Sequence, residues 1–331
     1  MPTYQAHYQA HTNIALIKYW GKRHSDLILP VTPSLSLTLE AFYTQTQVEF
    51  EPDDRQDSFI LNGQVQDPKA TAKVSRFVDH FRHQAQVPYR VQVSSQNYVP
   101  TAAGLASSAS AYAALACACN AALDLNLSRR DLSIIARQGS GSATRSLYGG
   151  FVEWVAGQSD QSETSYSQPF ADADWDLAMV VIIVNQAAKK FSSRWAMDHT
   201  MQTSPFYPQW AKQVDQDLAH IKPAILNHDL QTIGEIAEHN AMSMHALALS
   251  ANPSLCYFQG ESLTAMDQVR RLRQAGFLAY YTMDAGPNVK VLCPYSQAEG
   301  IRLRLSQVFP LDQLIISRPG PGPFSLEVNP A

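Results

Sequence analysis

Residues 100–123 read PTAAGLASSASAYAALACACNAAL, a loop of small residues that leads into a run built almost wholly of Ala, Ser, Leu and Cys. Residues 106–123 contain neither Gly nor Pro, so they are expected to form a helix. The run is apolar on nearly every face, which is typical of a helix in the middle of a molecule. The segment therefore predicts a central buried helix that begins at a tightly turning loop.

The loop itself, residues 100–110, has the properties of an anion site. Backbone N–H groups at a helix start carry partial positive charge and have no partner within the helix, so small side chains there leave room for a phosphate. Ser107, Ser108 and Ser110 add hydroxyls. The loop has neither the Gly-Lys-Ser/Thr end of a P-loop nor the spacing of G-x-G-x-x-G. Two interpretations stay open on the loop alone: a phosphate cradle, or small residues that merely allow close packing.

Composition limits the class of protein. The 331 residues are 45% hydrophobic and 16% charged, which indicates a globular chain of one large α/β unit or two tightly joined domains. The net charge of −4 argues against binding to nucleic acid, because contact with a phosphate backbone normally needs a basic face. The four cysteines have neither zinc-site spacing nor the density of a disulfide scaffold, and we expect buried thiols. Without a signal-like start or a long apolar run, the chain is predicted to be cytoplasmic and to bind no membrane.

The order of the predicted elements indicates an α+β arrangement, because strands and helices do not alternate regularly. Strands are predicted at 46–50, 89–93, 150–155, 177–184, 278–283 and 288–293. Further helices are predicted at 209–226, 230–249 and 260–275. The polar stretch 157–167 is a predicted surface loop and the best candidate, by composition, for a boundary between two halves. We place the division into an N-terminal and a C-terminal lobe at residues 1–185 and 186–331.

Two further segments contain polar residues in unusual places. In GSGSATRSLYGG, residues 139–150, two glycines surround serines, and Arg145 offers a rigid fork of donors that suits a carboxylate or a phosphate. The alternative is a turn with a surface arginine. In NIALIKYWGK, residues 13–22, Lys18 interrupts an apolar run, which costs desolvation unless the ammonium meets an anion. Lys18 could also extend its charged end to water.

Charged residues also follow the strands predicted at 177–184 and 278–283. Lys189, Lys190 and Arg194 come after the apolar run that ends at Val184, and taken singly such side chains are most often solvated. In MDAGPNVK, residues 283–290, Asp284 lies at a reversal between two predicted strands. An Asp beside Gly-Pro is by itself typical turn chemistry.

Together these segments resemble the GHMP kinase superfamily and, within it, the mevalonate diphosphate decarboxylases. The resemblance rests on NIALIKYWGKR and LPVTPSLSLTL near the start, PTAAGLASSAS, then GSGSATRSLYGGF, and MDAGPNVKVL near the end. PTAAGLASSAS is common to the superfamily, whereas KYWGK, GSGSATRS and MDAGPN are selective. The resemblance implies an α+β fold with a ribosomal protein S5 domain 2-like N-terminal lobe, an α/β-sandwich C-terminal lobe, an active site in the cleft between them, and a homodimer.

The activity that the resemblance implies uses ATP and Mg²⁺. The tertiary hydroxyl of mevalonate 5-diphosphate takes the γ-phosphoryl group of ATP, and phosphate and carbon dioxide then leave to give isopentenyl diphosphate. The competing interpretations are a mevalonate kinase on the same scaffold, a phosphomevalonate decarboxylase, and a catalytically silent nucleotide-binding homologue.

The resemblance also implies roles for individual residues. Asp284 matches the catalytic aspartate, Arg145 would hold the substrate carboxylate, and Lys18 would keep Asp284 ionised. The implied substrate contacts are Tyr19, Lys22, Ser140, Ser142, Arg145 and Arg194. The implied nucleotide contacts are Ala103, Gly104, Leu105, Ala106, Ser107 and Ser108, with either Lys189 or Lys190, and Ser107 is also the implied Mg²⁺ ligand.

Overall fold

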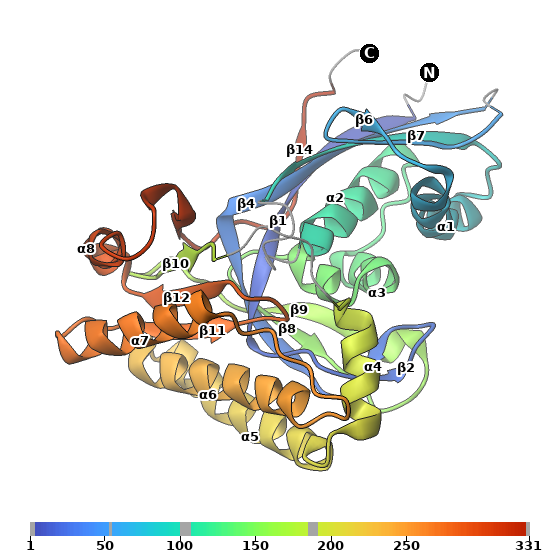
Figure 1. The fold of residues 1–331 in the computed structure, drawn as a ribbon. Helices are drawn as coiled ribbons and strands as arrows, with labels where there is room; N and C mark the ends of the chain where they lie inside the picture. The colour runs from blue at the N-terminus through green and yellow to red at the C-terminus, as the bar shows by residue number, and fades with distance from the viewer. Residues whose placement is uncertain (1–3, 53–54, 100–106, 185–190, 329–331) are drawn as a thin grey trace.

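The fold is that of a computed structural model in which residues 4–52, 55–99, 107–184 and 191–328 are described. In this part of the chain the larger sheet has the order β14 (Phe324–Leu326), β1 (Gln5–Ile17), β4 (Ser34–Glu51), β7 (Arg90–Tyr98), β5 (Ser58–Leu61) and β6 (Gln64–Val65). Beside β4 lies β8 (Phe151–Val155), and beside β8 lies β9 (Tyr166–Ala171). A second sheet has the order β11 (Tyr280–Met283), β12 (Val289–Cys293), β10 (Ala178–Ile182) and β13 (Leu314–Ser317), and Figure 1 shows it at the lower left, with the β6–β7 part of the larger sheet at the upper right.

The long strands β1 and β4 each contribute residues to two hydrophobic cores of the fold. The second half of β4 pairs with β7 and alternates between buried and half-buried residues, as expected for a strand with one covered face. Its first half pairs with β8 and is buried on both faces. The register between β1 and β4 shifts between His11 and Thr12, and such a bulge bends a ladder. The first half of β4 lies against β13 of the second sheet, where the backbone N–H of Ala41 donates to the hydroxyl of Ser317 at 3.0 Å.

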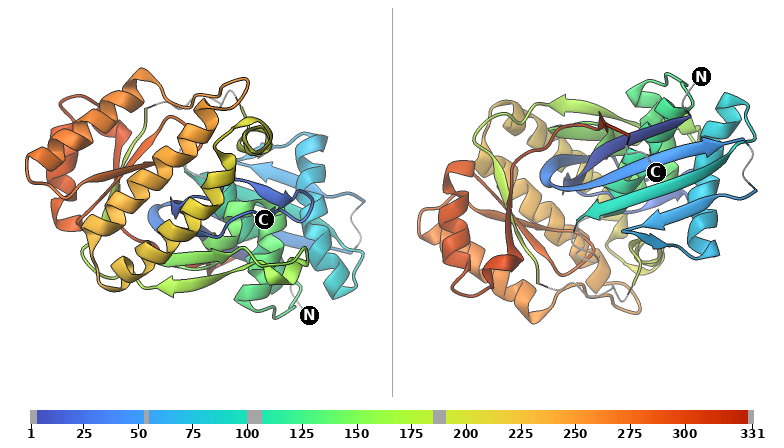
Figure 2. Two further views of the ribbon diagram at one scale, coloured as in Figure 1. Left: turned by 90° about the horizontal axis from the view of Figure 1, so that it is seen from below. Right: turned by 90° about the horizontal axis from the view of Figure 1, so that it is seen from above.

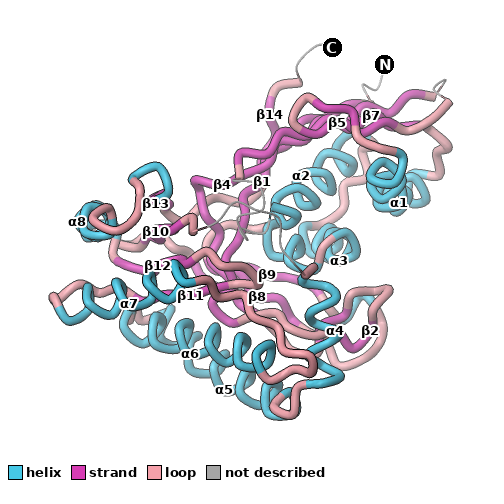
Figure 3. The backbone as a smooth tube through the Cα atoms, viewed as in Figure 1, coloured by secondary structure: helices cyan, strands magenta, loops and turns pink. Residues whose placement is uncertain are grey.

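Three helices cover one face of the first sheet: α1 (Pro68–Ala85), α2 (Ser107–Ala122) and α3 (Arg129–Gly139). Figure 3 shows them together on one side of the sheet. Most residues of α2 are buried, so the predicted central helix is confirmed over its described residues. Its Ser110 hydroxyl lies 2.7 Å from the hydroxyl of Thr44 on β4, which fixes a polar group inside this core.

The second sheet lies between two pairs of helices. One face of β10 packs with α7 (Gly260–Gln274) and α8 (Tyr295–Leu305). The other face, including Met179 and Val181, packs with α5 (Tyr207–Leu226) and α6 (Leu230–Leu249). In Figure 2 α5 and α6 lie side by side, and α4 (Ser193–Thr203) precedes them in the chain. Alternate residues of one strand thus belong to two cores, which is the pattern of a sandwich.

The smaller elements are the hairpin of β2 (Lys22–His24) and β3 (Leu29–Pro30), and the 3₁₀ turns η1 (Gly141–Leu147), η2 (Ser162–Thr164) and η3 (Leu311–Gln313). None of the described helices combines the length and apolarity needed to cross a bilayer.

The α+β prediction is confirmed, and each predicted helix and strand has a counterpart in the structure. Three details differ. The stretch 157–167 joins β8 to β9, which pair in one sheet, so it is not a linker between halves. The strand predicted at 46–50 is the end of the much longer β4. Cys256 is exposed, whereas the other three cysteines are buried as expected. The division between residues 185 and 186 falls outside the described residues and stays a prediction.

Close packing of α6 on β11 gives a stability prediction. A Cβ added at Gly234 would lie 2.2 Å from the ring of Tyr280, so Gly234→Ala should destabilise the protein by about 1–3 kcal/mol despite the better helix propensity of Ala. Gly260→Ala is the matched control, because nothing lies within 4 Å of that position. It should shift stability by less than about 1 kcal/mol. Urea unfolding followed by fluorescence measures both, and equal effects would contradict the packing argument.

Candidate active site

A cavity of about 530 Å³ lies where the end of β1, the α3–η1 junction, the start of α4 and the β11–β12 turn meet. Its lining includes one carboxylate, Asp284, and several cationic side chains from separate elements. The cations are Lys18, Lys22, Lys73, Arg145 and Arg194. Serine hydroxyls and small residues complete the wall. A protein with net negative charge thus gathers local positive charge at one cavity, as a site for anions requires.

Asp284 lies between two buried lysines. Its Oδ1 is 2.9 Å from Nζ of Lys18, which follows β1, and its Oδ2 is 3.1 Å from Nζ of Lys290 on β12. Lys18 also donates to the backbone carbonyl of Ala15 at 2.6 Å. Both lysine side chains are at most 2% exposed, so their charges are neutralised by the protein rather than by water.

The pKa values follow from burial and these contacts. Burial alone would raise the pKa of Asp284, but Lys18 and Lys290 outweigh it and hold this pKa below the ordinary value. Burial lowers the pKa of Lys18 to about 8, although Asp284 opposes the change. Burial, helped by Lys18, lowers the pKa of His245 on α6 to about 3, so this neighbouring imidazole is neutral. Asp284 is therefore ionised at neutral pH and Lys18 remains mostly protonated.

A chain of hydrogen bonds fixes the backbone at Lys18. Its N–H donates to Oδ1 of Asn240 on α6 at 2.8 Å, and Nδ2 of Asn240 donates to Asp217 on α5 at 2.7 Å. Asn240 is fully buried, so both ends of its amide are held in one orientation. The helices of the second sheet thus position a residue of the first.

Arg145 is held by side chains that leave its orientation little freedom. Its Nε donates to Oδ1 of Asn13 at 3.2 Å, and its Nη1 donates to the hydroxyl of Ser34. Asn13 in turn donates to the carbonyl of Ser142 at 3.0 Å. The guanidinium lies 5.8 Å from the ring centre of Trp154. Burial lowers its pKa to about 10, so the group stays charged and presents a fork to the cavity.

A row of hydroxyls connects the start of α2 to the turn after α3. Oγ of Ser108 is 3.0 Å from Oγ of Ser140, which is 3.4 Å from Oγ of Ser142. Ser107 is the first residue of α2, where unpaired backbone N–H groups begin. A Cβ at Gly141 would lie 2.8 Å from the ring of Tyr19, so only glycine admits that ring against the turn. These donors suit the oxygens of phosphate groups.

Tyr19 and Lys22, which follow β1, also line the cavity. Tyr19 packs on Trp154 with ring centres 4.6 Å apart, and burial raises its pKa, so its hydroxyl remains a donor. Nζ of Lys22 is 3.1 Å from Asp198 on α4. Arg194, near the start of the same helix, is exposed and lines the cavity.

The structure brings together most residues that the sequence pointed to. Those that line the cavity are Lys18, Tyr19, Lys22, Ser108, Ser140, Ser142, Arg145, Arg194 and Asp284. Ala103, Gly104, Leu105, Ala106, Lys189 and Lys190 lie outside the described residues.

Five polar residues at this site have no role assigned from the sequence. Lys290 interrupts the apolar run VKVL, which costs desolvation just as Lys18 does in its own apolar run. Asn13, buried in an apolar strand, carries a similar signal. Lys73, Ser192 and Ser193 also line the cavity, and nothing in their local sequence marks them.

Comparison with known proteins gives consistent matches over most of the chain. Residues 10–167 match the Diphosphomevalonate decarboxylase-like N-terminal domain, and residues 179–320 match the Mevalonate 5-diphosphate decarboxylase C-terminal domain. A diphosphomevalonate decarboxylase of Ganoderma lucidum is 36% identical, covering 94% of this chain and 83% of that protein.

Two solved structures are similar over 98% of this chain. The crystal structure of mevalonate diphosphate decarboxylase from Staphylococcus aureus has a TM-score of 0.93 and 47% identity, with 98% of that chain covered. A structure described as MDDEF in complex with MVAPP, AMPPCP and magnesium has a TM-score of 0.92 and 48% identity, with 99% of that chain covered.

The pairing of Asp284 with lysines predicts a measurable titration. In protein labelled with ¹³C at lysine, the Lys18 side-chain resonance should titrate with a midpoint near its pKa of about 8. In Asp284→Asn the midpoint should fall further, because the carboxylate that raises the pKa of Lys18 is gone. Lys18→Gln identifies the resonance, and Asp267→Asn, at an exposed pair with Arg271, is the control that should not move it. A midpoint at the ordinary 10.5 would contradict the predicted effect of burial.

Proposed function

The chain belongs to the mevalonate diphosphate decarboxylase family, and on this premise we propose how its own residues perform the reaction. It catalyses the ATP-dependent decarboxylation of mevalonate 5-diphosphate to isopentenyl diphosphate, with ADP, phosphate and carbon dioxide as the other products. One observation supports the roles below more than any other: Asp284 is held between Lys18 and Lys290 at a cavity that Arg145 also lines.

The nucleotide end is assigned to the start of α2. Hydroxyls of Ser107 and Ser108 and the free N–H groups of the helix start would hold phosphate oxygens of ATP, with the 103–106 loop and Lys189 or Lys190 as further contacts. Among the described residues no group of three or more His, Cys, Asp or Glu side chains could hold a metal. Serine oxygens such as that of Ser107 suit Mg²⁺ that arrives on nucleotide phosphates. When bound there, Mg²⁺ would neutralise part of the phosphate charge.

The substrate diphosphate is assigned to the wall that carries Tyr19, Lys22 and Arg194, with Ser140 and Ser142 on the turn after α3. Cations and hydroxyls from three elements surround this end of the cavity, so a group with several anionic oxygens can be bound by all of them at once. Arg145 would hold the substrate carboxylate, since its planar fork is fixed by Asn13 and Ser34.

Asp284 would then accept a hydrogen bond from the tertiary hydroxyl of the substrate. A carboxylate with a lowered pKa is a weak base, so it orients the hydroxyl and takes its proton late, when the oxygen has begun to bond to the γ-phosphorus and has become acidic. The bond from the γ-phosphorus to the bridging oxygen breaks, and ADP leaves. Positioning and charge neutralisation account for most of the catalysis in such a transfer.

In the second step the new phosphate group leaves with the electrons of its carbon–oxygen bond. The electrons of the bond to the carboxylate carbon form the double bond, and carbon dioxide departs. Arg145 keeps the carboxylate in the orientation that this elimination needs. Because carbon dioxide is neutral, the arginine loses its ionic partner as the product forms, which favours release.

A stoichiometric assay tests the proposed function. The protein is given mevalonate 5-diphosphate, ATP and Mg²⁺, and ADP, phosphate and carbon dioxide are measured together. Equal amounts of the three products are expected. ADP without carbon dioxide would indicate a kinase instead, and equal or faster turnover of mevalonate 5-phosphate would indicate a phosphomevalonate decarboxylase.

The family resemblance also supports a homodimer in the cytoplasm, and we include both in the proposal. Light scattering coupled to size exclusion should give twice the 36.6 kDa chain mass.

Asp284→Asn should lower kcat by about 10²–10⁴-fold, because a near-isosteric amide cannot take the proton. Binding of ATP, measured by calorimetry, should change little, since the carboxylate acts in the transition state. Asp267→Asn, on the surface of α7, is the control and should keep parental turnover. Parental kcat in Asp284→Asn would remove Asp284 from the reaction.

Arg145→Lys should lower kcat/KM for mevalonate 5-diphosphate by about 10-fold or more, since the planar fork is lost while the charge is kept. The matched control is Arg273→Lys, which weakens a bidentate pair with Glu238 on another part of the molecule. Activity of Arg145→Lys within a factor of two of that control would show that no bidentate grip on the carboxylate exists.

A further inference from the structure

The β2–β3 hairpin carries part of the wall at the diphosphate end of the cavity. Lys22 on β2 and Ile28 before β3 both line the cavity. Among the described strands, β2 and β3 pair with each other and not with either larger sheet. A two-stranded hairpin is marginally stable by itself in water, so other contacts must hold this wall in place.

The hairpin contains a strained residue at the cavity. Ile28 has φ of +50°, a left-handed conformation that a β-branched side chain rarely adopts. Its side chain is nevertheless 5% exposed and lines the cavity. Strain of this kind persists when surrounding contacts over-determine the backbone, and it is common at binding sites.

Arg137 supplies such a contact on the carbonyl next to Ile28. It lies near the end of α3, is fully buried, and its Nε donates to the backbone carbonyl of Leu27 at 3.0 Å. Its Nη1 donates to the carbonyls of Ser162 and Ser165, and its Nη2 donates to the hydroxyl of Ser162 at 2.6 Å. One guanidinium thus ties α3, the hairpin and the β8–β9 connection together.

The position of Arg137 indicates that it orients the cavity wall as well as packing in the core. Each of its hydrogen bonds described here goes to a carbonyl or hydroxyl oxygen rather than a carboxylate, so its charge is buried without a counter-charge at those contacts. Burial, and then the charge of Arg23, lowers its pKa to about 10, which still leaves it charged. Two residues later the chain reaches Gly139, and then Ser140, which line the cavity. Arg137 therefore fixes the distance between the two walls of the diphosphate end.

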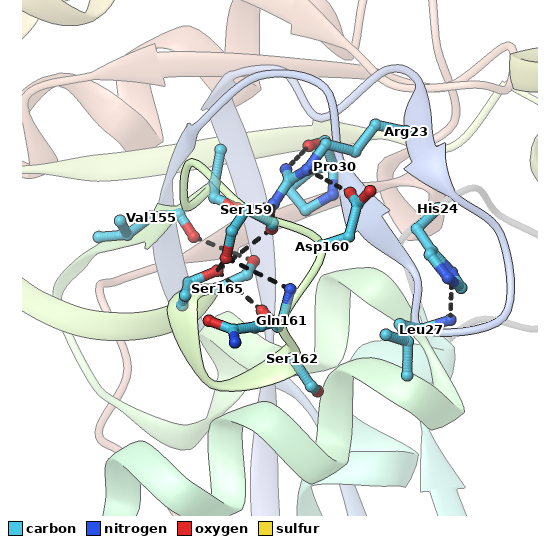
Figure 4. Close-up of polar contacts among 12 residues, drawn as sticks. Arg23, His24, Leu27, Pro30, Val155, Ser159, Asp160, Gln161, Ser162 and Ser165 are labelled. Carbon is cyan, nitrogen blue, oxygen red and sulfur yellow. Dashed lines mark hydrogen bonds and ion pairs between the residues drawn. The ribbon is translucent and has the colours of Figure 1, made fainter.

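Arg23, a residue of β2, also ties the hairpin to the β8–β9 connection. Its Nη1 donates to the carbonyl of Pro30, and its Nη2 donates to the carbonyls of Ala156 and Ser159 at 2.9 and 2.8 Å. Figure 4 shows Arg23 between Pro30 of the hairpin and Ser159 and Asp160 of the β8–β9 connection. Two arginines, Arg137 on α3 and Arg23 on β2, thus connect the hairpin to the β8–β9 connection.

We propose that Arg137, assisted by Arg23, is a positioning residue for recognition of the substrate diphosphate: it holds Leu27 and the strained Ile28 so that the wall with Lys22 faces Ser140 and Ser142. The inference rests on the proposed function. It assigns these arginines no contact with the substrate. Its consequence is a preference for the diphosphate over a monophosphate that depends on a buried residue outside the cavity lining.

The test uses Arg137→Lys and Arg23→Gln in the full-length protein. KM for mevalonate 5-diphosphate should rise about 10-fold in Arg137→Lys and about 3-fold in Arg23→Gln, with kcat and KM for ATP within 3-fold of the parent. The kcat/KM for mevalonate 5-phosphate should be unaffected. The ratio of kcat/KM for the diphosphate to that for the monophosphate should therefore fall by the same factors. Calorimetry without nucleotide should show the matching loss of affinity.

Arg82→Lys is the matched control, because Arg82 is another buried arginine that joins elements, through Asp57 and Asp79, away from the cavity. It should lower the melting temperature without changing the diphosphate preference. If Arg137→Lys loses preference no more than Arg82→Lys, the proposal is overturned. If Arg137→Lys does not fold, Arg23→Gln decides, since Arg23 is partly exposed, and an unchanged preference in it overturns the proposal. A parent that releases no carbon dioxide instead refutes the proposed function.

Discussion

The half-buried carboxylate of Asp284 joins the two halves of this molecule. Asp284 lies 2.9 Å from Lys18 at the end of the first sheet and 3.1 Å from Lys290 within the second. The two lysine charges, which are at most 2% exposed, could not be buried without this carboxylate, because each would face the full cost of desolvation. The two sheets must therefore meet at a geometry that places all three together, and the cavity lies where they meet.

The rest of the architecture positions the residues that surround this cavity. β1 and β4 are long enough to run from the core under α2 to the core against α5 and α6, which carries Lys18 to Asp284. Asn240 on α6 then fixes the backbone of Lys18. On the opposite side Arg137 fixes the hairpin after β1. Residues with no proposed substrate contact thus help to determine where the cationic groups stand, in addition to the ion pairs of Asp284.

The sequence predicts the elements of this fold well where a pattern is local. The apolar, Gly-free run of α2 and the 3.6-residue periodicity of α5, α6 and α7 appear directly in the chain. The full length of β4 was missed because its first half is buried on both faces and does not alternate. The connection at 157–167 was misread because polar loops join neighbouring strands as readily as they join domains.

Prediction of the site from sequence has a similar limit. Motifs point to Asp284, Arg145 and Lys18, but spacing alone cannot show that the side chain of Asp284, at a turn, meets Lys18, 266 residues away. Arg137 occupies a position on an amphipathic helix where an arginine is usually solvated. Its role depends on loops that approach it from residues 27 and 162, which no local pattern encodes.

The charge balance of the cavity explains how a negatively charged protein binds two anionic molecules. Burial lowers the pKa of Lys18 to about 8 against the effect of Asp284, and repulsion from Lys290 and Arg145 adds to the lowering. Anions entering the cavity oppose that repulsion, since an opposite charge favours the protonated ammonium. Part of the attraction for ligand is thus the relief of repulsion already present among buried cations. Because Asp284 is ionised before the reaction begins, the surrounding cations can bind the ligands while this carboxylate stays able to receive the hydroxyl proton.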